Sequence, residues 1–349
     1  MKSVICSFAL SLILAVTGCT RAETSGTANF SLWNDCEALT ALKAYVEDVT
    51  NKNSKNFIPE EDRIVTFDMD GTLIGELYPR YFVYNLLEYR ILEDPTYKDK
   101  ASESEIQIAN TIRDYGRKGI PFKSNFDYLQ FFATATAYSG ITLKDFDHYV
   151  KNFASRPAYG FSGMTFGEAF YKPMLEVIDY LNSKGFVNYI VSGSDRLIVR
   201  SLADLINFPA NKVIGLDIEI KADNQGDTAS IDYDFAVTDK TVRGNKVITE
   251  NVHSRKVEQI SQEIGKVPVL SFGNSTGDVA MHNFCLSNKK YKSMAFMLIA
   301  DDDVRDHAVR QKGLDLGERW KKAGYHVISM RDDFKTIYGE GVKTTEIKF

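Results

Sequence analysis

The chain has 349 residues, of which 44% are apolar, and a formal net charge of −5. This length is enough for one large domain or two smaller ones. The mild negative charge argues against nucleic acid as a partner. The five histidines and four cysteines form no CxxC or HxxH pair, so nothing indicates a zinc site.

The first 19 residues are typical of a bacterial lipoprotein signal peptide. Lys2 is followed by an apolar run from Val4 to Val16, which is too short and too early for a membrane span. The run ends in VTGC at residues 16–19, which resembles a lipobox. We expect Cys19 to be lipidated and to anchor an exported protein to the periplasmic or cell-surface side of a bacterial membrane. An ordinary signal peptide with a chance cysteine is the alternative.

The next segment reads as a connection between the anchor and the fold. Residues 20–29 are small and polar, and we assign residues 20–30 as a tether. Apolar residues at helical spacing predict a helix over residues 31–50. Cys36 in this helix and the distant Cys285 are open to two interpretations, a disulfide in an oxidising compartment or two free thiols.

Short apolar segments alternate with helical patterns along most of the remaining chain. Because strands that alternate with helices are typical of parallel sheets, we predict an α/β fold with a doubly wound sheet. Residues 219–250 alternate loosely and indicate a β excursion. The predicted strands are residues 63–67, 187–191, 213–218, 267–272 and 295–300, and the predicted helices are 168–184, 197–206, 255–264 and a last one ending near residue 323.

Residues 76–163 differ from this pattern because they are helical throughout and rich in aromatic side chains. We interpret them as a helical cap inserted into a core that residues 31–75 and 164–349 form. The helix signals are two capping boxes, Ser102 with Glu105 and Thr142 with Asp145, and two glycine stops, Gly119 and Gly140.

Polar residues follow several predicted strands, where ligands bind in open parallel sheets. Asp68 and Asp70 come directly after the first strand. Residues two apart on an extended segment can point the same way. Crowded carboxylates repel one another unless a cation lies between them, and Mg²⁺ prefers such oxygen ligands. The sequence therefore predicts a magnesium site at this edge of the sheet.

Three further segments complete the candidate site. Ser192 and Gly193 precede a helix whose free N–H groups suit a phosphate. Lys256 lies in the first turn of a helix that Ser254 is expected to cap, where the helix dipole disfavours a cation. Asn274 and Asp278 lie in a glycine-rich loop after the fourth strand. We interpret residues 301–303, three aspartates after the fifth strand, as a helix cap and solvated cluster.

Together these segments resemble the motifs of the haloacid dehalogenase (HAD) superfamily, specifically its phosphatase branch related to phosphoserine phosphatase. The resemblance covers most of residues 60–300. It is carried by FDMDGT at residues 67–72, VSGS at 191–194, Lys256, and GNSTGD at 273–278. The long segment between the first two motifs is similar to the cap of those enzymes.

The resemblance implies a role for each residue. Asp68 would attack phosphorus and form an aspartyl-phosphate, and Asp70 would act as general acid and then base. Ser192, Gly193 and Lys256 would hold the phosphoryl oxygens. Mg²⁺ would bind Asp68, the backbone carbonyl of Asp70, and a side chain of the fourth motif. That motif usually opens with an acid, but here Asn274 stands in its place, so either Mg²⁺ binds more weakly or Asp278 becomes a direct ligand.

The substrate is less well defined by the sequence. Glu76 and the aromatic residues of the cap, such as Tyr78, Tyr81, Phe82 and Tyr84, suggest cation–π binding of a small phosphomonoester with a cationic group, such as phosphoserine or phosphocholine. A broad scavenging phosphatase fits an exported enzyme equally well. The remaining alternatives are a phosphomutase and a non-catalytic binding lipoprotein with the same fold.

Overall fold

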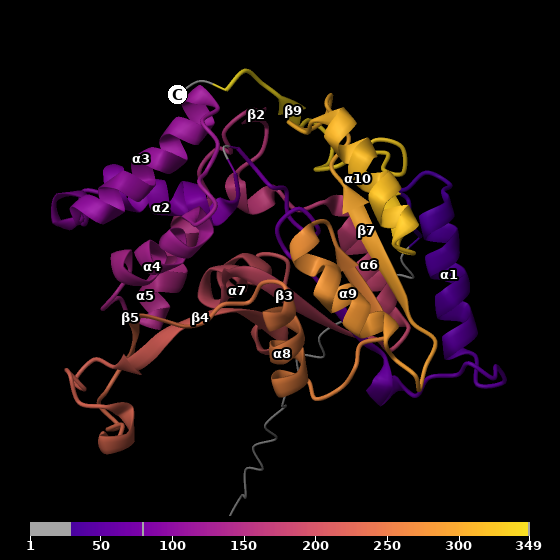
Figure 1. The fold of residues 1–349 in the computed structure, drawn as a ribbon, viewed down its shortest axis with the longest axis horizontal. Helices are drawn as coiled ribbons and strands as arrows, with labels where there is room; N and C mark the ends of the chain where they lie inside the picture. Colours follow the sequence, from indigo (N-terminus) through magenta and orange to yellow (C-terminus); the bar gives the residue numbers. More distant parts are fainter. Residues whose placement is uncertain (1–28, 79, 348–349) are drawn as a thin grey trace, which may run out of the picture.

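The computed structural model describes residues 29–78 and 80–347 (Figure 1). The predicted signal peptide, the lipobox with Cys19 and nearly all of the tether lie outside the described residues. Within the described ranges, no helix is both long and apolar enough to cross a bilayer.

A seven-stranded sheet with the order β5-β4-β3-β1-β6-β7-β8 forms the centre of the molecule. Neighbouring strands are parallel except for β4 and β5, which are antiparallel. The central strand β1 is buried at all four positions, as expected for a parallel strand covered on both faces. The strands are β1 (Ile64–Phe67), β3 (Val187–Asp195), β4 (Val213–Ala222), β5 (Thr241–Thr249), β6 (Leu270–Gly273), β7 (Met294–Ile299) and β8 (His326–Ser329).

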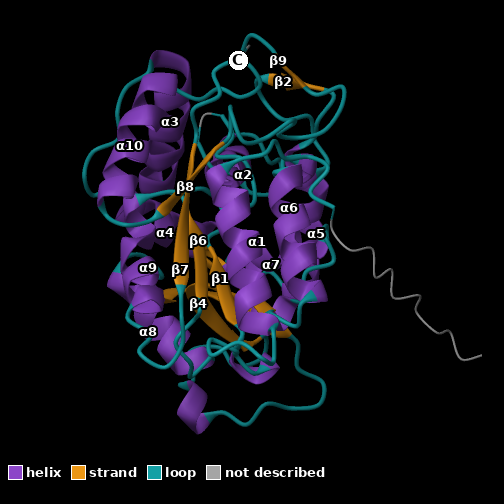
Figure 2. Cartoon of the chain, turned by 90° about the vertical axis from the view of Figure 1, so that its right-hand side faces the viewer, coloured by secondary structure: helices purple, strands orange, loops and turns teal. Residues whose placement is uncertain are grey.

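Helices cover both faces of this sheet (Figure 2). Alternate residues of β7 show the two layers: Met297 packs with Trp320 on one face, while Phe296 and Leu298 join the main core on the other. The predicted α/β doubly wound architecture is therefore confirmed. One face carries α1 (Glu37–Thr50), α6 (Lys172–Ser183) and α7 (Arg196–Asp204), and the other carries α8 (Ser254–Glu263), α9 (Val279–Leu286) and α10 (Arg310–Lys322).

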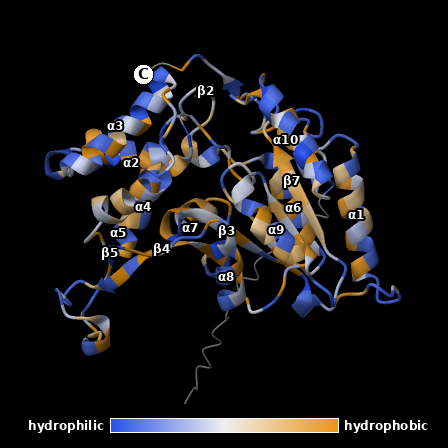
Figure 3. Ribbon diagram, viewed as in Figure 1, coloured by the Kyte–Doolittle hydropathy of each residue, from blue (hydrophilic) through white to orange (hydrophobic). Residues whose placement is uncertain are grey.

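Strand β7 is mostly hydrophobic, whereas helices such as α1 alternate hydrophobic and hydrophilic residues along the ribbon (Figure 3). Among the described residues, Cys36 and Cys285 form no disulfide: the Cys36 Sγ accepts from the Leu39 N–H at the start of α1, and Cys285 is buried within α9. Short 3₁₀ helices connect the larger elements at Glu60–Asp62, Lys98–Lys100, Phe166–Glu168, Ala210–Lys212, Ser230–Asp232 and Thr276–Asp278.

All five predicted strands are present, but the prediction that residues 295–300 form the last strand is wrong. β8 follows α10 and pairs with β7 at the edge of the sheet. Its sequence, HVIS, is short and half polar, so it gives little apolar signal. The predicted β excursion is a hairpin, in which β4 extends beyond the sheet and β5 returns along it.

The segment between β1 and β3 is helical, with α2 (Phe82–Leu92), α3 (Glu103–Lys118), α4 (Phe126–Ala137) and α5 (Leu143–Ala154). Ser102 and Glu105 form the predicted capping box, and Gly119 ends α3 in the left-handed conformation. Thr142 caps α5 through the Asp145 N–H. At the end of this segment, β2 (Phe161–Ser162) pairs with β9 (Lys343–Thr344) near the C-terminus.

The cap contacts the β4–β5 hairpin at Arg243 in β5, which also forms a buried ion pair with Asp195 in β3. The Arg243 guanidinium donates to Asp195 Oδ2 at 2.7 Å, and both side chains are buried. The same guanidinium lies 4.2 Å from the ring of Phe146 in α5. Backbone hydrogen bonds also join Arg243 to Gly140 and Ile141 in the α4–α5 connection. Arg243 thus contacts both the end of β3 and the cap.

Candidate active site

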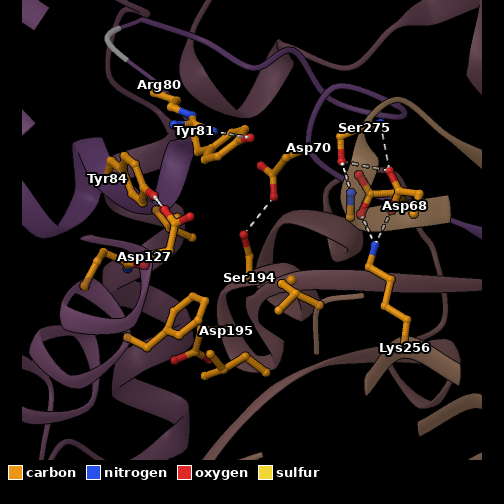
Figure 4. A pocket seen from close by; sticks show the side chains of 18 of the residues that line it. Asp68, Asp70, Arg80, Tyr81, Tyr84, Asp127, Ser194, Asp195, Lys256 and Ser275 are labelled. Atoms are coloured by element: carbon orange, nitrogen blue, oxygen red, sulfur yellow. Dashed lines mark hydrogen bonds and ion pairs between the residues drawn. The ribbon is translucent and has the colours of Figure 1, made fainter. Parts of the chain in front are cut away.

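A cleft of about 290 Å³ lies where β1, β3 and β6 end beneath the cap (Figure 4). Its floor comes from residues that follow these strands and from the first turn of α8. Its opposite wall comes from α2, α4 and the segment before α2. The carboxyl edge of the sheet is therefore the place where the predicted site residues meet.

Lys256 joins the first and fourth candidate motifs. Its ammonium donates to Oδ1 of Asp68 and to Oδ1 of Asp278, each at 2.6 Å, and to the Val191 carbonyl at 2.8 Å. All three side chains are buried. Burial alone would lower the pKa of Lys256, but the two carboxylates outweigh it and raise the pKa, so the lysine stays charged.

Asp278 organises the loop that carries it. Its Oδ2 accepts from the backbone N–H groups of Asn274 at 3.1 Å and Ser275 at 3.0 Å, while its Oδ1 accepts from Lys256. Although burial alone would raise the pKa of Asp278, the charge of Lys256 lowers it. The carboxylate is therefore ionised, and both of its oxygens have partners.

Asp68 and Asp70 both line the cleft, as the sequence predicts. The Asp68 N–H donates to the Phe272 carbonyl at 2.9 Å, which fixes Asp68 at the end of β1. Burial and the charge of Asp278 raise the pKa of Asp68 above its ordinary value, against the opposing charge of Lys256. Burial also raises the pKa of Asp70 to about 6, although the hydroxyl of Ser194 donates to its Oδ2 at 2.7 Å.

The position predicted for Ser192 differs from the structure. Ser192 is fully buried and its hydroxyl accepts from the Ser194 N–H at 3.1 Å. Gly193 and Ser194 line the cleft instead. The reason is that β3 continues to Asp195 with an irregular register after Val191, so the side chains at the strand end do not follow the simple predicted exit.

Asn274 lines the cleft and contacts Glu76. Its Nδ2 donates to Glu76 Oε1 at 3.1 Å. Gly71 makes room for this pair, because a Cβ there would lie 1.9 Å from Asn274 Nδ2, and its φ of +79° favours glycine. Glu76, predicted to contact the substrate, is thus a partner of Asn274 and does not line the cleft.

The aromatic residues of the cap divide into two groups. Tyr81 and Tyr84 line the cleft. Phe82 is buried against Phe153 and Phe166, and the Tyr78 hydroxyl donates to a backbone carbonyl of α3. Only part of the aromatic cluster therefore faces the cleft.

The interpretation of residues 301–303 as a helix cap and solvated cluster is wrong for Asp301 and Asp302, which are buried and accept from the Ser329 hydroxyl and the Arg305 N–H, while α10 begins only at Arg310. None of the three lines the cleft.

Several lining residues were missed by sequence reasoning, among them Arg80, Asp127, Asp195 and His253. They come from separate segments, so no local motif reveals them. His253 illustrates the difficulty, because it precedes α8 with a φ of +53° and without a side-chain cap. The predicted cap, Ser254, is instead the first residue of the helix, since the chain enters α8 through this strained turn.

No family model matches the sequence, and no curated protein matches it either. Among solved structures, the chain is similar to a conserved functionally unknown protein from Anaerococcus prevotii, with 15% identity over 89% of this chain and 97% of that chain and a TM-score of 0.54. A second similar structure is a phosphoserine phosphohydrolase-like protein from Francisella tularensis, with 15% identity over 76% of this chain and 94% of that chain and a TM-score of 0.40. A third is a probable phosphoserine phosphatase from Vibrio cholerae, with 11% identity over 80% of this chain and 68% of that chain and a TM-score of 0.39. The first similarity shows a shared fold over most of the chain.

Proposed function

We propose that the protein is a Mg²⁺-dependent phosphomonoesterase that works through an aspartyl-phosphate on Asp68. The observation that carries this proposal is the meeting of Asp68, Asp70 and Lys256 in one cleft under a cap. A nucleophile, a proton carrier and a fixed cation are the groups that phosphoryl transfer to a carboxylate requires.

The reaction proceeds in two steps. A carboxylate oxygen of Asp68 bonds to phosphorus while the bond to the ester oxygen breaks, and Asp70 protonates the departing alcohol. Asp70 then takes a proton from a water molecule whose oxygen attacks phosphorus, which releases phosphate and restores Asp68. A pKa raised to about 6 suits a group that carries a proton in both directions.

Lys256 and the backbone around Gly193 and Ser194 stabilise the charge that develops on the phosphoryl group. The ammonium is already held against Asp68, so it needs no rearrangement when the phosphoryl oxygens arrive. Gly193 and Ser194 line the cleft immediately before α7, where the positive end of the helix dipole suits an anion.

The residues present fit a magnesium ion. In the described part of the chain, no three His, Cys, Asp or Glu side chains are grouped to hold a metal. The donors are instead the Asp68 carboxylate, the Asp70 backbone carbonyl and the Asn274 amide oxygen, a set that suits an ion which retains water and phosphate ligands. Asp278 is assigned a supporting role because both of its oxygens have partners. When bound, Mg²⁺ supplies charge neutralisation for the phosphate.

The substrate size and the location of the protein are proposed from the cleft and from the N-terminal sequence. The cleft volume of about 290 Å³ suits a small phosphorylated metabolite. Nucleic acid is not a proposed partner. Lipid attached to Cys19 would hold the protein on the periplasmic or cell-surface side of a bacterial membrane, close to exported phosphate esters.

Hydrolysis of p-nitrophenyl phosphate by the purified protein tests the proposal. We expect turnover with Mg²⁺, loss of turnover with EDTA, and loss of turnover in Asp68→Asn. Asp227→Asn, which removes an exposed acid on the β4–β5 hairpin, serves as the control and retains activity. If no phosphate is released, vanadate binding to the native protein distinguishes a selective enzyme from a binding module. Transfer from a bisphosphate to a sugar phosphate would instead identify a phosphomutase.

A further inference from the structure

A buried asparagine behind the cleft contacts the segment that is proposed to hold the phosphoryl group. Asn251 lies between β5 and α8, is fully buried and does not line the cleft. Its Nδ2 donates to the backbone carbonyl of Ser192 at 2.8 Å. Ser192 directly precedes Gly193 and Ser194, which do line the cleft. Asn251 therefore reaches the phosphate-binding segment from the side away from the cleft.

This contact fixes the orientation of one peptide group. In a trans peptide, the carbonyl and the N–H point in opposite directions. Because the Ser192 carbonyl points toward the buried Asn251, the Gly193 N–H of the same peptide points away from it, toward the side on which Gly193 lines the cleft. The carbonyl of Val191 also has a donor, since Lys256 Nζ lies 2.8 Å from it. Both carbonyls that precede Gly193 are thus held by the segment around the start of α8.

Gly193 needs such a restraint because it has no side chain. A peptide next to glycine rotates at little steric cost, and rotation of the 192–193 peptide would turn a carbonyl oxygen toward the phosphate. A larger residue does not fit here, because a Cβ on Gly193 would lie 2.9 Å from Cγ1 of Val252. The segment that excludes a side chain at this position therefore also supplies the hydrogen bond that holds its peptide.

The amide of Asn251 makes this contact without a full set of partners. Its Oδ1 is buried and has no hydrogen-bond partner within the described ranges. A buried polar atom without a partner is unfavourable. Exchange of Asn251 for leucine would remove this oxygen but would deprive the Ser192 carbonyl of its donor instead. The two effects oppose each other, so the distinct contribution of the amide is the orientation of the peptide.

The segment that carries Asn251 is tied to the other motifs of the site. The His253 N–H donates to the Gly277 carbonyl in the fourth motif at 3.2 Å, and Lys256 contacts Asp68 in the first. His253 has a φ of +53°, a conformation that is unfavourable for a histidine and persists where surrounding contacts enforce it. Asn251 is therefore held in a fixed position relative to the whole site.

We propose that Asn251 is a positioning residue, which holds the Ser192 carbonyl so that the Gly193 N–H is directed at a phosphoryl oxygen. This inference rests on the proposed phosphatase function, in which Gly193 helps to bind the phosphoryl group. Asn251 itself touches neither the substrate nor the metal. It acts before the substrate arrives, because a donor that is already oriented needs no rearrangement when charge develops.

Tungstate binding to the full-length protein in the presence of Mg²⁺ tests this inference without turnover. Tungstate is a tetrahedral oxyanion like phosphate, and calorimetry measures its Kd. Asn251→Leu removes the donor and keeps the approximate size of the side chain. We expect the Kd to rise about tenfold, as the loss of one oriented hydrogen bond to an anion implies. The thermal midpoint should stay near the native value, and kcat/KM for p-nitrophenyl phosphate should fall with the tungstate affinity.

Asn188 provides a matched control, because it is also a buried asparagine that donates to a backbone carbonyl. Its Nδ2 donates to the Ile178 carbonyl at 3.3 Å and to Asn182 Oδ1 at 2.9 Å, and in the described part of the chain its Oδ1 has no partner. Asn188 lies at the opposite end of β3 from Gly193 and does not line the cleft. Asn188→Leu should therefore leave the tungstate Kd unchanged.

The outcomes separate this inference from the phosphatase activity itself. Tungstate binding that is weakened by Asn251→Leu alone, at a native thermal midpoint, would support the role of Asn251 even if no ester were hydrolysed. Native turnover together with unchanged tungstate affinity in Asn251→Leu would remove that role and leave the phosphatase proposal standing. An equal loss in Asn188→Leu, or no tungstate binding by the native protein, would also overturn the inference.

A second variant covers the case in which Asn251→Leu does not fold. Asn251→Val also lacks a donor, and its smaller side chain does not crowd the site. It is judged by the same tungstate Kd and thermal midpoint. If this variant unfolds as well, or loses affinity only together with stability, the amide has a structural role and the proposal is overturned.

Discussion

Glu76 accepts a hydrogen bond from the side-chain amide of Asn274 at 3.1 Å, although the two residues are 198 positions apart. The contact fixes the amide with its nitrogen toward Glu76 and its oxygen on the opposite side. It also places a negative charge beside the position where an aspartate was expected, and this charge contributes to the raised pKa of Asp70. Glu76 thus compensates in part for the missing acid.

This relationship predicts the effect of exchanging the two side chains. Glu76→Gln should weaken Mg²⁺ binding by about tenfold, because the amide loses a charged acceptor that orients it. The double variant Glu76→Gln, Asn274→Asp should restore or exceed the native affinity, since it supplies a carboxylate ligand with a donor beside it. Calorimetric titration with Mg²⁺ measures both. A double variant that binds no better than Glu76→Gln would exclude this orienting role.

Replacement of Lys256 should affect stability as well as activity. Lys256→Met leaves Asp68 and Asp278 buried without their shared cation, which is expected to cost about 3 kcal/mol at neutral pH. The loss should shrink under acidic conditions as the carboxyl groups become protonated. Urea denaturation at several pH values measures this change. A loss of activity with unchanged stability at every pH would refute the prediction.

The ion pair between Arg243 in β5 and Asp195 in β3 should stabilise the part of the sheet that the cap contacts. Arg243→Met leaves the buried Asp195 carboxylate unpaired and is expected to lower the free energy of unfolding by about 3–5 kcal/mol. Adding Asp195→Asn should recover part of this loss. Denaturant unfolding of the two single variants and the double variant gives the coupling energy. Additive losses would show that the pair contributes little.

The buried His282 should make stability depend on pH. Burial lowers its pKa to about 4, and its Nδ1 lies 2.6 Å from the Ser271 hydroxyl oxygen. The unfolded chain binds a proton near pH 6.5, whereas the folded protein does not. The contribution of His282 is therefore fully present above about pH 6.5 and is lost as the pH falls toward 4.

A comparison with His282→Asn isolates this effect. The other titrating groups are shared by the two proteins, so the difference between their unfolding free energies reports on the histidine. This difference should change with pH between about 6.5 and 4 and be flat above that range. A difference that is constant across the whole range would show that His282 is protonated equally in both states.

The sequence predicts the parts of the site that local patterns encode. Asp68 and Asp70 follow a buried strand, and Lys256 is conspicuous because a cation in the first turn of a helix opposes the dipole. The structure explains that position, since the ammonium is held by Asp68 and Asp278 and not by the helix. The order of the motifs and their positions at strand ends were thus sufficient to predict that residues far apart in the chain meet in one site.

The remaining features depend on packing and register. Because the end of β3 is irregular, Ser194 lines the cleft where Ser192 was predicted. No residue pattern signals that irregularity. Arg80 reaches the cleft through a positive φ at Tyr81, a residue type that rarely adopts it. The contact between Glu76 and Asn274 requires the folded chain. Such features follow from tertiary structure, which local propensity does not encode.

Mass spectrometry of acid-quenched protein after brief incubation with a phosphate ester and Mg²⁺ tests the central claim most directly. The account predicts one phosphoryl group on the peptide that contains Asp68, absent in Asp68→Asn and absent without substrate. Phosphate release with no phosphorylated Asp68 peptide under any quench condition, or phosphorylation of a different residue, would contradict it.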